Sequence, residues 1–64
     1  MTFAHPTLHI IDAETHRVIS DEVFSDNRWY GGSEIIARHG VRYRIESQQI
    51  GAFHYYIWVS IYKE

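Results

Sequence analysis

The sequence predicts a mainly β protein: a small antiparallel sheet, or an open barrel of SH3-like proportions, with four or five strands. Over residues 41–49 and 53–62, apolar residues alternate with polar or aromatic ones, a period of two that is typical of strands with one buried face. Residues 7–12 and 17–24 are also strand-like and are joined by a short polar segment. Because the chain has 64 residues, it has room for a single domain, residues 1–64.

The first two strand-like runs, residues 7–12 and 17–24, are expected to form a β-hairpin. Asp12 opens the connection, where a carboxylate accepts hydrogen bonds from backbone amides two or three residues further on. His16 stands where a left-handed residue is needed, a conformation that histidine tolerates better than a branched residue does. In the predicted register Ile11 lies opposite Arg17, Ile10 opposite Val18 and His9 opposite Ile19.

Residues 25–32 are expected to form a loop, and residues 33–40, which follow, allow two interpretations. Trp29 and Tyr30 are too large to be left in solvent, so we expect residues 25–32 to fold back as a lid over one end of the core. Ser33 and Gly40 could cap and close a short helix at about 33–39, which gives an α+β alternative of two β-hairpins and one helix. The same residues also fit a strand, a turn and a second strand. This interpretation is favoured because so short a helix is weak.

The two clearest strands, residues 41–49 and 53–62, are expected to form the last hairpin. Tyr43, Ile45, Ile57 and Val59 supply the centre of the core. The apolar side chains of both strands can reach one core only if apolar residues of one strand lie opposite apolar residues of the other. A three-residue loop that pairs Gln49 with Phe53 is the simplest solution. On the other face, this register places Arg44 opposite Trp58, Glu46 opposite Tyr56 and Gln48 opposite His54.

The second face of the last strand is aromatic, where a solvated strand would carry charges. Tryptophan, tyrosine and arginine are enriched at the energetic centres of protein interfaces. The face is therefore a candidate partner-binding surface, made of Trp58, Tyr56, Tyr62, His54, Arg42, Arg44 and Glu46. The alternative is a second core layer, in which Trp29, Tyr30 or the possible helix covers these side chains.

Charge is unevenly distributed along the chain, whose net charge is −2. Residues 1–27 carry one basic and five acidic side chains, and residues 28–64 carry five basic and three acidic ones. A secondary acidic patch, Asp21, Glu22 and Asp26, is either a solvated strand end or a surface that docks on a basic partner. A general nucleic-acid binder would normally be more basic, so the balance favours a protein partner.

Several chemistries are not expected. The chain has no cysteine, which excludes disulfides, thiolate metal sites and cysteine nucleophiles. Its five histidines are scattered and lack the usual zinc spacings, so the sequence predicts no metal site and no cofactor. Ser60 and His54 are too far apart along one strand to act together. A domain this small has little depth for a water-excluding site, so we expect no enzymatic activity.

These observations predict a small non-enzymatic protein-interaction module. A chain this short is often an accessory or inhibitory factor, of the kind that a phage or other mobile element uses to bind a host protein. The alternatives are a single-stranded nucleic-acid binder that uses the aromatic and arginine face, and a structural homodimer that buries it. With no leader-like segment and no apolar run of about 20 residues, we expect a cytoplasmic location and no membrane partner.

Overall fold

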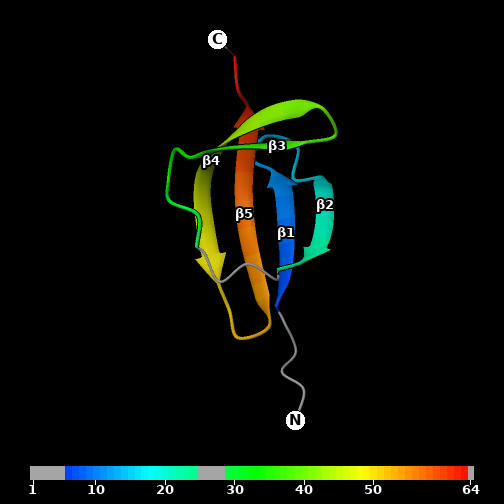
Figure 1. Cartoon of the computed structure of the whole chain (residues 1–64), viewed down its shortest axis with the longest axis vertical. Coiled ribbons are helices and arrows are strands. Elements are labelled where there is room, and N and C mark those ends of the chain that lie inside the picture. Colours follow the sequence, from blue (N-terminus) through cyan, green and yellow to red (C-terminus); the bar gives the residue numbers. More distant parts are fainter. Residues whose placement is uncertain (1–5, 25–28, 64) are drawn as a thin grey trace.

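The computed structural model describes residues 6–24 and 29–63, and it confirms a mainly β fold. Five strands, β1 (Thr7–Asp12), β2 (Val18–Val23), β3 (Ile35–Arg38), β4 (Val41–Ile50) and β5 (His54–Ile61), form one sheet. Their order is β2-β1-β5-β4-β3 (Figure 1), and the sheet curls into a half-barrel. Among the described residues there is no helix, and hence none that could cross a membrane.

One pairing departs from the predicted antiparallel sheet. The first and last strands, β1 and β5, run parallel at the centre, where Leu8 is the neighbour of Tyr55 and Ile10 the neighbour of Ile57. Each of them has an antiparallel hairpin partner on its other side. Parallel neighbours require a long connection, and in this chain β2, β3 and β4 provide it. The sheet is therefore mixed.

The β1–β2 hairpin is confirmed, and so is the chemistry of its turn. The Asp12 carboxylate accepts hydrogen bonds from the backbone amides of Glu14 (2.8 Å) and Thr15 (3.0 Å). These amide donors hold the pKa of Asp12 below its usual value. His16 adopts the expected left-handed conformation, with φ at 62°.

The predicted register of this first hairpin is wrong. Ile11 lies opposite Val18, Ile10 opposite Ser20 and His9 opposite Asp21, with an irregularity between Ile10 and Ile11. A bulge places one extra residue on one strand, so the register moves by one further residue beyond it.

The helix alternative for residues 33–39 is wrong, because β3 pairs with β4 instead. Ile36 lies opposite Tyr43, and the two strands are joined at His39 and Gly40. These residues have φ values of 55° and 76°, the left-handed pair that a two-residue hairpin turn requires.

The register of the β4–β5 hairpin also differs from the prediction. Ile45 lies opposite Val59 and Arg44 opposite Ser60, while Trp58 lies opposite Ser47. The ladder shifts between Ile45 and Ser47, where Glu46 is the extra residue of a bulge. The bulge reverses the alternation of β4, so that beyond it Gln48, which would otherwise face outward, lies opposite the core residue Ile57.

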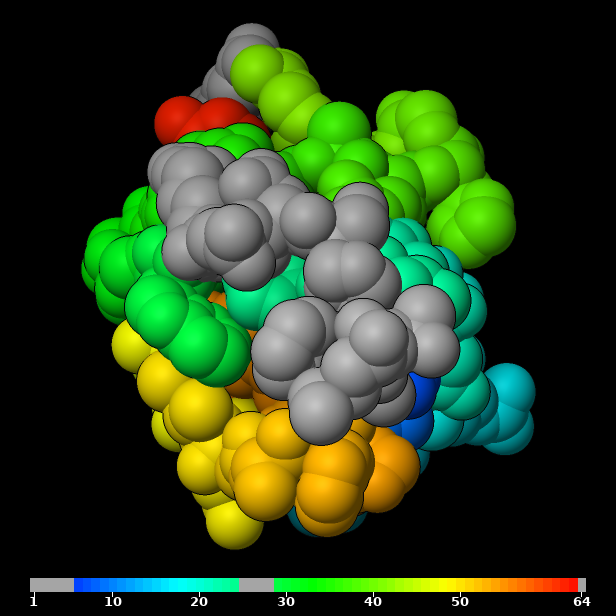
Figure 2. All heavy atoms as spheres, turned by 60° about the horizontal axis from the view of Figure 1, so that its bottom comes forward, coloured from blue at the N-terminus to red at the C-terminus, as the bar shows by residue number. Residues whose placement is uncertain are grey.

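The concave side of the sheet holds the core, which includes the four residues predicted for its centre. Its buried side chains are Leu8, Ile10, Phe24, Ile36, Tyr43, Ile45, Tyr55, Ile57 and Val59. The predicted lid is confirmed for Trp29 and Tyr30, whose rings lie 4.9 and 6.3 Å from that of Tyr55. Figure 2 looks towards the end of the molecule where the β4–β5 hairpin turns, and residues 29–34 lie beside β4. The rest of the lid segment, residues 25–28, lies outside the described residues.

The hydroxyl of Tyr55 fixes the lid to the core. It accepts a hydrogen bond from the backbone N–H of Tyr30 (3.0 Å) and lies 3.3 Å from the Tyr30 carbonyl oxygen. It also donates to the side-chain oxygen of Gln48, the residue that the β4 bulge turned inward. Burial raises the pKa of this phenol.

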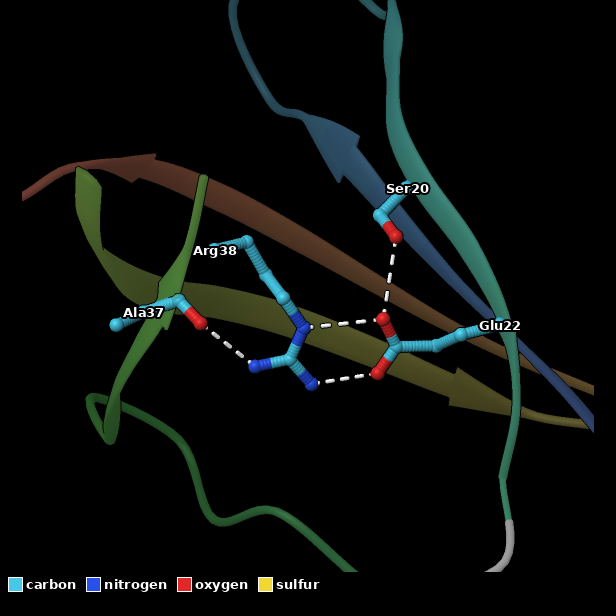
Figure 3. Close-up of polar contacts among 4 residues, drawn as sticks. All are labelled: Ser20, Glu22, Ala37 and Arg38. Atoms are coloured by element: carbon cyan, nitrogen blue, oxygen red, sulfur yellow. Dashed lines mark hydrogen bonds and ion pairs between the residues drawn. The ribbon is translucent and has the colours of Figure 1, made fainter. Parts of the chain in front are cut away.

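An ion pair joins the two edge strands across the open side of the half-barrel (Figure 3). Arg38 on β3 donates through Nε (3.0 Å) and a terminal nitrogen (2.5 Å) to the carboxylate of Glu22 on β2. The other terminal nitrogen of Arg38 donates to the carbonyl of Ala37, and Ser20 donates to Glu22. The hydrogen bonds from Arg38 lower the pKa of Glu22.

Candidate functional site

The convex side of the sheet, here called the outer face, carries the side chains that alternate with the core residues. On β5 these are His54, Tyr56, Trp58 and Ser60, and on β1 Thr7, His9 and Ile11. On β4 they are Arg42 and Arg44 before the bulge, Glu46 at the bulge, and Ser47 and Gln49 beyond it. All five strands belong to a single sheet, so the described residues supply no second layer over this face. Trp29 and Tyr30 pack on Tyr55 instead, on the core side.

A ladder of near-parallel aromatic rings crosses the middle of the outer face. His54, Tyr56 and Trp58 follow one another along β5, with ring centroids 5.9 and 6.0 Å apart. His9, on the neighbouring β1, stacks on Tyr56 at 4.7 Å with 17° between the ring planes. The rings cover part of each other, and Tyr56 and Trp58 are half-buried. The structure thus brings together three of the residues predicted for partner binding and adds His9.

Apolar side chains extend the outer face beyond the ladder towards both edges of the sheet. Val23 and Val18 on β2 are 68% and 56% exposed, and Ile35 on β3 is 39% exposed. Their strand partners Thr7, Ile11 and Arg44 belong to the outer face. The aromatic centre is therefore flanked by exposed aliphatic side chains on both edge strands.

Arg42, Arg44 and Tyr62 form a second group on this face, beyond the end of β5. The guanidinium carbons of Arg42 and Arg44 lie 5.5 and 5.9 Å from the centre of the Tyr62 ring, within the range of a cation–π contact. The backbone N–H of Tyr62 donates to the carbonyl of Arg42 (2.9 Å), which holds Tyr62 beside β4. The predicted contact of Arg44 with Trp58 is absent because the register places Arg44 opposite Ser60.

Glu46 does not lie beside Tyr56 as the predicted register required. At the bulge of β4, its carboxylate accepts a hydrogen bond from the hydroxyl of Ser60 (2.7 Å). The contact leaves Glu46 exposed and at the margin of the aromatic ladder.

The residues of the predicted acidic patch have separate contacts. Asp21 lies opposite His9 and interacts with its ring, whereas Glu22 pairs with Arg38 across the open side of the half-barrel. Neighbouring residues of a strand point to opposite faces, so these two carboxylates do not form one surface. Asp26 lies outside the described residues.

Sequence reasoning missed His9 as a site residue, and it placed Asp21 in the acidic patch without its contact to His9. Nδ1 of His9 lies 2.6 Å from Asp21, and its Nε2 lies 2.9 Å from Nδ1 of His54. Three strands, β2, β1 and β5, thus contribute to one chain of hydrogen bonds. The alternation of β1 places His9 opposite to Leu8 and Ile10, but only the parallel pairing of β1 with β5 brings it to His54.

A hollow at the C-terminal end of β5 carries no comparable arrangement. It is lined by Asp12, Glu14, Ser60, Ile61 and Lys63. The Asp12 carboxylate already accepts the hydrogen bonds of the hairpin turn, and the Ser60 hydroxyl donates to Glu46. The outer face is therefore the better candidate site.

Comparisons with protein-family models, with curated proteins and with solved structures gave no match. The assignment of a function therefore rests on the arrangement of the outer face itself.

Proposed function

We propose that this protein is a non-enzymatic interaction module that binds a protein partner through its outer face. The observation that carries the proposal is the ladder of His54, Tyr56 and Trp58 along β5, flanked by exposed aliphatic side chains on both edge strands. Exposed apolar and aromatic side chains gathered on one face of a small protein mark an interaction site. Trp58, near the middle of the surface, is the expected energetic centre.

A single-stranded nucleic acid is a weaker candidate for the partner. Such binders stack bases on the open faces of aromatic rings, but His9 stacks on Tyr56, and two arginines approach the ring of Tyr62. Asp21 and Glu46 also place negative charges at the margins of the surface. A nucleic-acid complex would weaken steeply between about 50 and 200 mM salt.

A homodimer is the other candidate, with two outer faces that bury each other. Light scattering distinguishes it, because a dimer would have twice the monomer mass of 7.6 kDa at micromolar concentration. A charge at the centre, as in Trp58→Glu, would then convert the dimer to a monomer.

The deciding experiment is an affinity capture from the native cell with three matched baits: the wild type, Trp58→Ala and Phe53→Ala. Phe53 is 70% exposed and precedes β5 at the hairpin, so its substitution removes an exposed aromatic ring outside the ladder. We expect a protein that the wild type and Phe53→Ala retain and Trp58→Ala loses, also after nuclease treatment. With the purified partner, Trp58→Ala should cost about 2 kcal/mol or more of affinity.

The melting temperature of each bait is measured first, so that lost folding is not mistaken for lost binding. If Trp58→Ala keeps a cooperative transition and still retains the same proteins as the wild type, the outer face is not the docking surface.

A further inference from the structure

The group formed by Asp21, His9 and His54 has features of a metal-binding site, and hydrogen bonds hold its side chains close together. It lies at the junction of three strands, with Asp21 on β2, His9 on β1 and His54 on β5. The His9 side chain is 18% exposed and His54 is exposed, so an ion from solution can reach the two imidazoles.

The two nitrogens that face each other are already close to the spacing that a metal ion requires. His9 Nε2 and His54 Nδ1 are 2.9 Å apart. Metal–nitrogen bonds of about 2.1 Å at neighbouring coordination positions place the two nitrogens about 3.0–3.4 Å apart. At this spacing the ion lies to one side of the line that joins the two nitrogens. The rings would therefore have to separate by a few tenths of an ångström and turn until both lone pairs point at the ion.

Asp21 supports the site from the far side of His9. Its carboxylate lies 2.6 Å from His9 Nδ1, so it fixes the proton on Nδ1 and leaves the lone pair of Nε2 directed at His54. A carboxylate behind a histidine ligand is a recurrent arrangement in metal sites, where it orients the ring and raises its basicity. Tyr56 adds to this by stacking on His9 at 4.7 Å.

We propose that His9 and His54 form a two-histidine site for a borderline divalent transition-metal ion, such as Cu²⁺, Ni²⁺ or Zn²⁺, with Asp21 as the residue that positions His9. Imidazole nitrogen suits these ions. When His54 binds the ion through Nδ1, its ring proton is on Nε2. The titratable groups that face the pair are Asp21 from β2 and Tyr56 from β5.

Two protein ligands leave the ion with open coordination positions. Among the described residues there is no group of three potential ligands, because Asp21 is on the opposite side of the His9 ring. The ion is thus exchangeable, and the fold does not depend on it. On the outer face, a histidine or carboxylate of a protein partner can complete the coordination of the ion. This last step rests on the proposed function, but the two-histidine site does not.

The test uses Cu²⁺–iminodiacetate, a chelate that leaves neighbouring copper positions open for two imidazoles, titrated into the free protein and followed by calorimetry and electron paramagnetic resonance. We expect binding in which two imidazole nitrogens bind the copper. His54→Ala should weaken it by about a hundredfold through loss of the second contact. Asp21→Asn should weaken it by about tenfold or more.

His39→Asn is the matched control, because it removes a turn histidine at a positive φ that asparagine tolerates. It should bind like the wild type, and circular dichroism should show each variant folded. The proposal is overturned if wild type and His54→Ala bind the chelate equally, or if His39→Asn loses as much. These outcomes leave the role of Trp58 in partner binding untouched, so the two proposals fail separately.

Discussion

Substitution of Tyr55 by phenylalanine should remove the hydrogen bonds that join the lid to the core and keep the ring packing between them. The Tyr55 side chain is fully buried, and phenylalanine keeps its ring between Phe24, Trp29 and Tyr30. Only the hydroxyl is lost. With it go the hydrogen bonds to the Tyr30 backbone and to the side-chain oxygen of Gln48.

The expected cost follows from these contacts. A net hydrogen bond contributes about 0.5–1.5 kcal/mol, and a buried partner left unsatisfied costs about 1–3 kcal/mol. Because the Tyr30 segment is only partly buried and water can replace some contacts, we expect Tyr55→Phe to lower the free energy of unfolding by about 2 kcal/mol. In a domain of this size, that corresponds to a fall in melting temperature of roughly 8–16 °C.

Tyr43→Phe provides the matched control. Tyr43 is also a core residue, at 9% exposed, but its hydroxyl has no hydrogen bond within residues 6–24 and 29–63. Urea unfolding of both variants gives the two costs, and hydrogen exchange of the Tyr30 amide reports on the lid. Equal costs for the two substitutions, or an unchanged exchange rate at Tyr30, would refute the role assigned to the Tyr55 hydroxyl.

Three further substitutions test other parts of the fold. Ile57→Ala removes a fully buried side chain and should cost about 2–5 kcal/mol in chemical denaturation; a cost below about 1 kcal/mol would mean that the faces of β5 are reversed. Gly40→Ala introduces a side chain at φ +76° and should cost about 1–2 kcal/mol, so a variant that melts with the wild type would contradict the turn geometry. The pKa of Glu22 is lowered by Arg38, so their pair stabilises the fold above the unfolded-state pKa, near 4.5, and this contribution is lost as the pH falls through the lower, folded-state pKa. Glu22→Gln should reduce the loss of unfolding free energy over that pH range, by less than about 1 kcal/mol because the pair is partly exposed. An unchanged dependence of stability on pH would show that the ion pair contributes nothing.

The features that the sequence predicted correctly are local ones. The turn at Asp12, the left-handed His16 and the choice of strand for residues 35–38 depend on a few neighbouring residues. The aromatic ladder of His54, Tyr56 and Trp58 follows from alternation along one strand. Each of these patterns lies within a short stretch of chain, so it can be read without knowledge of the rest of the fold.

The registers and the histidine pair were missed because they depend on interruptions and on distant pairing. A bulge adds one residue to a strand and reverses its alternation. In β4 the bulge shows in the spacing of Ile45 and Ile50. These residues are an odd number of positions apart, yet both pair with core residues of β5, Val59 and Tyr55. The contact of His9 with His54 requires the parallel β1–β5 pairing, for which no local signal exists.

That parallel pairing also bears on how the chain reaches its folded state. Three of the four strand pairings are hairpins that close over short loops, but β1 meets β5 only after almost the whole chain has been spanned. Closure of so long a loop is entropically costly, and distant contacts slow folding. We expect the hairpins to form early and transiently, and the cooperative transition to await the arrival of β5 between β1 and β4. A chain that ends before β5 would leave both of those strands with an unpaired edge, the kind of surface on which β-aggregation begins.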